Sequence, residues 1–252
     1  MPTPTLTILV PVFNEQECLL PFKESMDQYL SGTPVPSEVL FIDDGSTDRS
    51  RQIIRQLCAQ DRRYRYLALT RNGGLSTALK AGFDHAQTPW IGYIDADLQT
   101  TPLDFLSYFP HLDGHAMVNG IRIQRQDRFL KKLSSRLANR YRRWLIADGI
   151  TDSCCPLKII DATYAQRLPF FRGMHRFIPA LVQLQGGSVR QVEVRHFERF
   201  AGTAKYHLWN RLVAPFFDTL AFVWMKKRYI RYEVAERSPV PTAVLMPESV
   251  RL

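Results

Sequence analysis

Three short apolar runs, each ending in polar residues, dominate the first hundred residues of the chain. They cover residues 6–10, 39–42 and 90–94, and their β-branched and aromatic content predicts buried strands. Helices are expected between them, the clearest over residues 49–60 with Asp48 as its N-cap. Alternating strands and helices predict an open parallel α/β sheet, whose ligands bind outside the carboxyl ends of the strands. The polar turns are therefore expected to line one ligand-binding crevice.

The turn Asp95-Ala96-Asp97 carries the most chemical information, because it directly follows the run 90–94. Two carboxylates two residues apart project to the same side of a strand end, and Gln99 can add an amide oxygen. Such hard oxygens suit a divalent cation whose remaining positions are filled by water and by the phosphates of a ligand. The turn therefore predicts Mg²⁺ or Mn²⁺ at Asp95, Asp97 and Gln99, with an ordinary acidic loop as the alternative.

Four motifs follow one another along the chain: Pro11-Val12-Phe13-Asn14-Glu15, Ile42-Asp43-Asp44-Gly45-Ser46-Thr47-Asp48, Arg71-Asn72-x-Gly74 and Asp95-Ala96-Asp97-Leu98-Gln99. Together they resemble the motifs of the family-2 glycosyltransferases, and within that family those of the polyprenyl-phosphate glycosyltransferases of the dolichyl and undecaprenyl type. The resemblance covers about residues 5–232. It implies a GT-A-type, Rossmann-like open sheet with helices on both faces, and a nucleotide diphospho-sugar donor. The implied donor-binding residues are Pro11, Asn14, Glu15, Asp43, Asp44, Arg71, Asp95 and Ala96. Either Asp43 or Asp44 would contact the base, and Gly74 would allow a turn with close backbone approach.

Length and composition agree with one catalytic domain. At 252 residues and 45% hydrophobic content, the chain can bury a full core over residues 1–210. No signal peptide is recognisable, which predicts a cytosolic protein. The four cysteines, Cys18, Cys58, Cys154 and Cys155, have no zinc-binding spacing and are expected to be reduced thiols.

The charge is distributed very unevenly along the chain. Residues 1–121 contain 9 Lys/Arg and 14 Asp/Glu, whereas residues 122–252 contain 24 and 10. Residues 122–143 read as a basic amphipathic helix, with nine basic residues and the single acid Asp127. A solvated helix face and an anionic membrane surface both fit this pattern. A nucleic-acid partner is not expected, because no recognisable motif supports it.

The apolar segment 212–225 is too short and too interrupted to span a bilayer, which takes about 20 apolar residues. Its aromatic residues and the trailing Lys226-Lys227-Arg228 predict an amphipathic interfacial helix over residues 211–232. A core helix that closes the domain is the alternative. Residues 233–252 are expected to be a disordered tail.

The acceptor side of the expected site is basic. A phosphomonoester acceptor brings its own negative nucleophile and needs cations rather than a base. Gly120-Ile121-Arg122 and Arg199-x-x-Gly-x-Ala-Lys205-Tyr206 resemble family motifs, although Ala204 replaces the usual Ser. The primary candidates are Arg122, Arg199 and Lys205; the secondary ones are Arg125, Lys131 and Arg136, and His175 is an additional contact.

Asp152-x-x-Cys155-x-x-Lys158 resembles another family motif, in which Asp152 lines the sugar site or forms a structural turn. No cysteine nucleophile is expected. The expected catalytic residues are Asp97, Arg122, Asp152, Arg199 and Lys205. The sequence thus predicts an inverting transfer of a sugar from a nucleotide to a polyprenyl phosphate, at the cytoplasmic membrane face. Two alternatives stay open: a saccharide or lipid hydroxyl acceptor with Asp152 as the base, and an inactive membrane-bound adaptor.

Overall fold

A computed structural model of the chain describes residues 5–123, 144–198, 200, 208–231 and 235–236. Its strands are β1 (Leu6–Val12), β2 (Ser37–Asp43), β3 (Tyr64–Ala68), β4 (Trp90–Tyr93), β5 (Met117–Arg122), β6 (Lys158–Asp161) and β7 (Val189–Val194). Its α-helices are α1 (Leu19–Gly32), α2 (Ser50–Gln60), α3 (Leu75–His85), α5 (Ala162–Gln166), α6 (Ile178–Leu184) and α7 (Leu208–Arg228). Short 3-10 helices are η1 (Pro102–Ser107), η2 (Phe109–His111) and η3 (Met174–Arg176). All three strands expected in the first hundred residues are present.

The described strands form one sheet in the order β3-β2-β1-β4-β6-β5-β7. β6 runs antiparallel to both of its neighbours, so the sheet is mixed rather than purely parallel as expected. The register pairs Tyr93 at the end of β4 with Lys158 at the start of β6. The start of β6 therefore lies at the same edge of the sheet as the carboxyl ends of the parallel strands. We call this edge the carboxyl edge.

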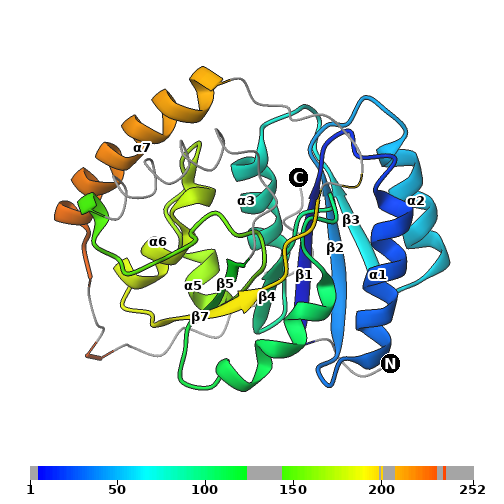
Figure 1. The fold of residues 1–252 in the computed structure, drawn as a ribbon, viewed down its shortest axis with the longest axis horizontal. Coiled ribbons are helices and arrows are strands. Elements are labelled where there is room, and N and C mark those ends of the chain that lie inside the picture. The colour runs from blue at the N-terminus through cyan, green and yellow to red at the C-terminus, as the bar shows by residue number, and fades with distance from the viewer. Residues whose placement is uncertain (1–4, 124–143, 199, 201–207, 232–234, 237–252) are drawn as a thin grey trace, which may run out of the picture.

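Helices cover both faces of the sheet, as predicted (Figure 1). α1, α2 and η1 pack on one face around Phe22, Tyr29 and Phe105. α3, α5, α6 and α7 pack on the other around Phe83 and Phe177. The chain changes face between β3 and β4, and β4 then pairs with β1 on the side away from β2. The topological switch point, where open α/β sheets bind ligands, therefore lies between β1 and β4.

The predicted starts of two helices, at Arg122 and at Arg49, differ from the structure. Arg122 is the last residue of β5, so a helix does not begin there as expected. Most of that predicted basic helix, residues 124–143, lies outside the described residues, and residues 144–146 are helical. α2 begins one residue later than expected, at Ser50, and the Asp48 carboxylate accepts the Ser50 amide at 2.9 Å, as a capping residue does.

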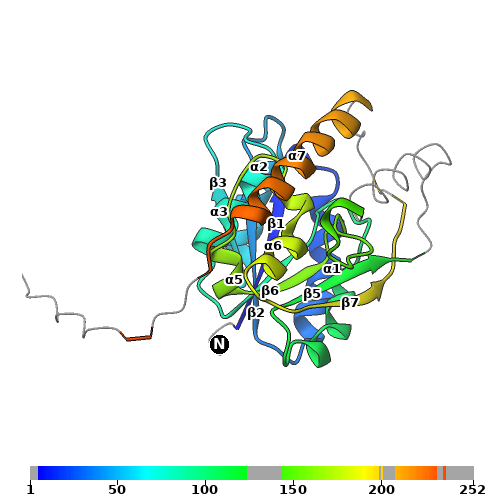
Figure 2. The ribbon, with the colours of Figure 1, turned by 90° about the vertical axis from the view of Figure 1, so that its left-hand side faces the viewer.

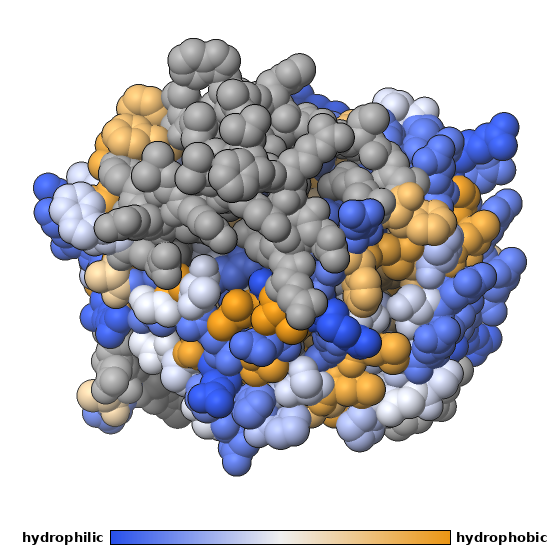
Figure 3. Space-filling view, viewed as in Figure 1, coloured by the Kyte–Doolittle hydropathy of each residue, from blue (hydrophilic) through white to orange (hydrophobic). Residues whose placement is uncertain are grey.

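α7 runs along the outside of α6 (Figures 1 and 2) and has two apolar sides. Toward the domain, Phe222 is buried and stacks on Phe177 with ring centroids 5.3 Å apart. Away from it, four large apolar side chains are exposed by 42–63%, namely Phe216, Phe217, Leu220 and Trp224. Figure 3 shows hydrophobic residues at this margin of the molecule. The side of α7 that carries Phe222 therefore agrees with a core helix. The side that carries Phe216, Phe217, Leu220 and Trp224 has the exposed apolar surface that an interfacial helix needs. No helix among the described residues has the length and apolarity needed to cross a membrane.

Candidate active site

The carboxyl edge brings together most of the residues singled out in the sequence. Turns after β1, β2 and β4 meet there, together with the loop before α3, the end of β5 and the loop before β6. Pro11 belongs to β1 itself, beyond Leu9, which is the last β1 residue that pairs with β4. Its missing N–H therefore leaves no ladder bond unmade on that side.

The turns after β1 and β2 are tied together by hydrogen bonds from Asn14. Its side-chain oxygen accepts the backbone amides of Thr47 at 2.8 Å and Asp48 at 3.3 Å, and its backbone amide donates to Ser46 Oγ at 3.1 Å. The Glu15 amide donates to Ser50 Oγ at 2.9 Å. Asn14 has a left-handed backbone with φ 51°, which is uncommon outside glycine and marks a tightly determined turn. Asn14 and Glu15 thus shape the turn between the two strands.

Asp43 and Asp44 both have buried carboxylates but bind different parts of the chain. Asp43 accepts the Ser46 amide at 3.0 Å and pairs with Arg51 of α2, a residue that the motifs did not indicate. Asp44 accepts the amides of Gly73 and Gly74, both at 2.8 Å. Burial raises the pKa of Asp44, the two amides oppose that shift, and the nearby Asp43 carboxylate adds to it.

The loop 71–74 is therefore organised around Asp44, and we call it the donor loop. Gly74 has φ 84°, which confirms a glycine-dependent turn. The close backbone approach occurs instead at Gly45, where an added Cβ would lie 2.5 Å from the Arg71 carbonyl carbon. Arg71 is exposed, next to this contact.

The acidic turn Asp95–Gln99 lies at the switch point, directly after β4. Asp95 is half-buried and accepts the Tyr93 hydroxyl at 2.8 Å, while Asp97 is 8% exposed and accepts the Gln99 amide at 3.2 Å. Burial raises the pKa of Tyr93 well above its usual value, reinforced by Asp95 and Asp97, so its hydroxyl stays a donor. Leu98 has φ 59°, a costly conformation for a bulky residue. Ala96 is buried beneath the turn.

Two carboxylates and an amide in one short turn form a donor set that suits a hard divalent cation. No cluster of three or more His, Cys, Asp or Glu side chains with metal-binding geometry occurs in the described part of the chain. The three oxygen ligands that this turn can offer would leave coordination positions of such a cation for phosphate oxygens.

Arg122 and Asp152, 30 residues apart in sequence, form a buried bidentate ion pair. Arg122 Nε and Nη2 donate to the two Asp152 oxygens at 2.8 and 2.9 Å, and the side chains are 13% and 8% exposed. Burial acts to lower the pKa of Arg122, but the bonds and charge of Asp152 outweigh it and raise the pKa overall. Arg122, the candidate for phosphate binding, and Asp152, the candidate general base, are thus bound to each other.

Lys158 and Asn119 hold the loop that carries Asp152, although the sequence motifs gave them no role. The Lys158 ammonium is buried and donates to Asn119 Oδ1 at 2.7 Å, to the Ser153 carbonyl at 3.1 Å and to the Cys155 carbonyl. Asn119 Nδ2 donates to the Asp152 carbonyl at 3.0 Å. Burial lowers the pKa of Lys158, with Cys155 and Asp152 opposing that shift. The three ammonium protons match three acceptors, as a buried charge requires.

The cysteines are all free thiols, as expected. Burial raises the pKa of Cys155 to about 11, so it does not supply a thiolate nucleophile at neutral pH. Cys154, by contrast, is exposed.

Several acceptor-side candidates lie outside the described residues: Arg125, Lys131, Arg136, Arg199 and Lys205. The described residue Phe197 lies beside the acidic turn, because its amide donates to the Gln99 carbonyl at 2.9 Å. The chain therefore passes the acidic turn two residues before Arg199. His175 lies in η3, where its ring contacts Ser76 of α3 at 2.8 Å.

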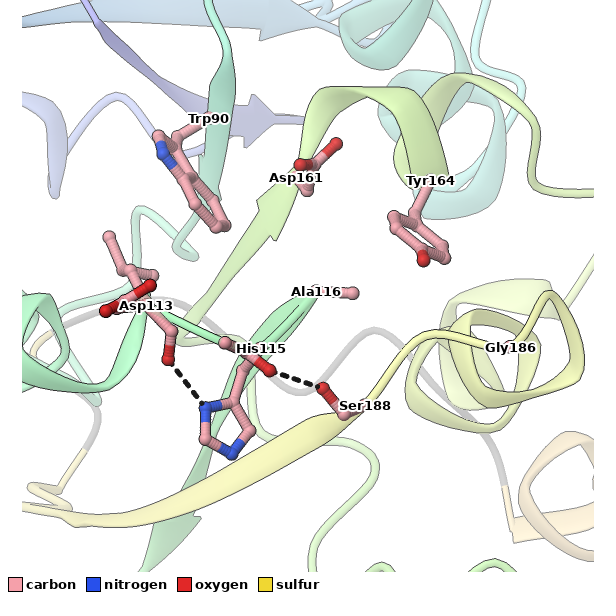
Figure 4. A pocket seen from close by; sticks show the side chains of 10 residues that line it. Trp90, Asp113, His115, Ala116, Asp161, Tyr164, Gly186 and Ser188 are labelled. Atoms are coloured by element: carbon pink, nitrogen blue, oxygen red, sulfur yellow. Dashed lines mark hydrogen bonds between the residues drawn. The ribbon is translucent and has the colours of Figure 1, made fainter.

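A hollow of about 630 Å³ lies at the opposite edge of the sheet (Figure 4). Trp90 at the start of β4, Asp161 at the end of β6 and Tyr164 line it, together with Asp113 and His115. None of the predicted site residues contributes to it. We therefore place the candidate active site at the carboxyl edge, where the predicted carboxylates lie together with Arg71 and Arg122.

Comparison with known proteins gives two kinds of match. Residues 7–170 match the model of glycosyl transferase family 2. A dodecaprenyl-phosphate galacturonate synthase from Rhizobium johnstonii is 30% identical over 234 residues, covering 90% of this chain and 68% of the relative. An undecaprenyl-phosphate 4-deoxy-4-formamido-L-arabinose transferase from Edwardsiella ictaluri is 30% identical over 206 residues, covering 81% and 63%. The chain thus spans about two thirds of the length of these relatives or slightly less.

Solved structures share the fold at lower identity. Mannosyl-3-phosphoglycerate synthase from Rubrobacter xylanophilus superposes with a TM-score of 0.67 at 15% identity, covering 94% of this chain and 79% of that one. Glucosyl-3-phosphoglycerate synthase from Mycobacterium tuberculosis, in complex with Mn²⁺, UDP-glucose and phosphoglyceric acid, gives 0.64 at 16%, covering 88% and 79%. These matches confirm the predicted GT-A-type open sheet with helices on both faces. The chain belongs to glycosyl transferase family 2 and is a family-2 glycosyltransferase.

Proposed function

We propose that this enzyme transfers a sugar from a nucleotide diphospho-sugar to a polyprenyl phosphate, with inversion, at the cytoplasmic face of the membrane. Residues 1–210 form the catalytic domain and residues 211–232 the interfacial segment, whose helix α7 begins earlier and ends earlier than expected, at Leu208 and Arg228. The observation that carries the proposal is a carboxylate-rich edge beside an exposed aromatic helix, in a chain whose relatives are named for polyprenyl-phosphate substrates.

The donor lies at the switch point, with its base and ribose along the turns after β1 and β2 and its diphosphate at Asp95–Gln99. Asp95, Asp97 and Gln99 would hold Mg²⁺ or Mn²⁺, which supplies the positive charge that the departing diphosphate needs. Because Asp44 is used to hold the amides of the donor loop, its role toward the base is to position that loop. Arg71, exposed beside Gly45, is placed to contact the nucleotide.

The acceptor phosphate approaches from the side of Arg122. Nε and Nη2 of Arg122 donate to Asp152, and Nη1 has no hydrogen-bond partner among the described residues. A phosphate can therefore bind Arg122 without displacing Asp152, with Arg199 and Lys205 supplying further charge. A hydroxyl acceptor is disfavoured, because both Asp152 oxygens already accept from Arg122 and removing a proton would disturb that pair.

The acceptor lipid places the reaction at a bilayer surface, and α7 is the element suited to it. Phe217 and Trp224 are exposed by 62% and 63%, and the basic residues 226–228 follow on the same helix. Aromatic side chains insert at the headgroup level, and basic residues near anionic headgroups contribute about 1 kcal/mol each. We expect this side of α7 to lie on the membrane.

The test is a transfer assay with the full chain on anionic vesicles that contain undecaprenyl or dolichyl phosphate. UDP- and GDP-sugars are screened with Mn²⁺ and with Mg²⁺, and the lipid-linked sugar is measured. At least one donor should give transfer that EDTA abolishes, that Asp97→Ala loses and that Asp113→Ala, at the opposite edge, retains. Transfer only to saccharide hydroxyls would favour the other acceptor class. Absence of metal-dependent donor binding would indicate the inactive adaptor.

A further inference from the structure

α7 is fastened to the turn that contains η3. Asp218 of α7 pairs with Arg176 at 3.1 Å, and Phe222 stacks on Phe177 with an interplanar angle of 9°. Gly173, with φ 93°, begins the turn, and a Cβ there would lie 2.3 Å from the Asp218 carboxylate. Only glycine allows this contact, so the position of the turn depends on the position of α7.

Ser76, in the first turn of α3, holds the same turn from the other side. Its hydroxyl accepts the Gly173 amide at 3.1 Å and lies 2.8 Å from His175 Nδ1. Burial lowers the pKa of His175 to about 3, with Arg176 and Lys158 adding to the shift, so the ring is neutral at physiological pH. The Ser76 hydroxyl therefore accepts from the Gly173 amide and shares a second hydrogen bond with His175 Nδ1, whose donor depends on the tautomer of the ring.

The first turn of α3 is continuous with the donor loop. Gly73 and Gly74, whose amides bind Asp44, lie two and three residues before Ser76. α7 is thus linked to the Asp44 carboxylate by the ion pair of Asp218 with Arg176, by the turn that contains η3, and by the first turn of α3. We call the set Ser76, Gly173, His175, Arg176 and Asp218 the clasp.

We propose that the clasp couples membrane docking of α7 to the donor loop, so that the loop is held more firmly around Asp44 when α7 is seated on lipid. This inference rests on the proposed function, because it requires α7 to dock on a membrane. Lipid gives α7 a partner for its exposed apolar side and so favours the conformation in which Asp218 and Phe222 engage the turn. Because coupling is reciprocal, a ligand that orders the donor loop would also tighten membrane binding by the same factor.

The experiment compares hydrogen exchange in peptides spanning residues 70–77 without vesicles, with phosphatidylcholine vesicles and with phosphatidylglycerol vesicles. Co-sedimentation measures binding to the same vesicles. In the wild-type chain, anionic vesicles should slow exchange by about fivefold or more, the lower range of ordinary coupling. Asp218→Asn should still bind these vesicles but lose the slowing. Asp84→Asn, which removes the exposed pair with Lys80 at the far end of α3, should behave as wild type.

Two results would overturn the coupling while leaving the proposed function intact. One is vesicle binding without any slowing in the wild-type chain, and the other is equal slowing in Asp218→Asn. A wild-type chain that binds neither kind of vesicle would instead refute the membrane part of the proposed function, and the coupling with it.

Discussion

The neutral ring of His175 makes the stability of the protein depend on pH in a calculable way. The pKa of His175 lies at about 3 in the folded chain, against an ordinary value of 6.5, first because of burial and then because of Arg176 and Lys158. Since the folded-state pKa is depressed, the stability contribution is fully present above pH 6.5. It is lost progressively as the pH falls from 6.5 toward 3, because only the unfolded chain takes up the proton.

The size of the effect follows from this difference. At pH 5.5, one unit below the ordinary value, the unfolded imidazole is largely protonated and the folded one is neutral, which costs about 1.4 kcal/mol of unfolding free energy. The cost grows by up to about 1.4 kcal/mol for each further unit until the folded group titrates. Other groups also titrate in this range, so a difference between two variants is needed.

His175→Asn supplies that difference, because its side-chain amide can accept from or donate to the Ser76 hydroxyl but does not titrate. We expect urea unfolding at pH 7.5 and 5.5 to show that the wild-type chain loses about 1.4 kcal/mol more than His175→Asn. His85→Asn, at an exposed position, is the control and should keep the wild-type loss. Equal losses in wild type and His175→Asn would refute the assignment of a half-buried ring that stays neutral in the folded chain.

Two further predictions concern the ion pair and the glycines. Asp152→Asn and Arg122→Met should each lower the unfolding free energy by about 3–5 kcal/mol, because each leaves a buried charge uncompensated, and the double variant should lose less than the sum. Additive losses in denaturant titrations would argue against the pair. Gly74→Ala should cost about 1–3 kcal/mol for its backbone conformation alone, since an added Cβ meets nothing within 4 Å. Gly45→Ala should cost clearly more because its Cβ would meet the Arg71 backbone, and a melting temperature no lower than that of Gly74→Ala would contradict this.

The positions of the acids could be predicted because they depend on local patterns. Apolar runs that end in Asp43-Asp44 and Asp95-x-Asp97 place carboxylates at strand ends, and parallel strands bring those ends together. The family resemblance then supplied the expected donor chemistry.

Contacts between distant segments could not be predicted in the same way. Arg122 and Asp152 each matched a motif, but their pairing depends on β6 running antiparallel to β4, which no local pattern specifies. The same reversal brings Lys158 to Asn119. The two apolar sides of α7 were equally unpredictable, because hydropathy shows that a residue is apolar but not whether the domain covers it.

The bonds of Lys158 have a consequence for how much the chain can vary in length. Its ammonium reaches back to the carbonyls of Cys155 and Ser153, three and five positions earlier, so the number of residues between Ser153 and Lys158 is fixed by the length of one side chain. An insertion or deletion between them would move a carbonyl out of reach and leave a buried charge without an acceptor. Arginine could not replace this lysine, because its planar fork does not match three converging oxygens. Loop-length variation that is tolerated on most surfaces should therefore be excluded at this loop.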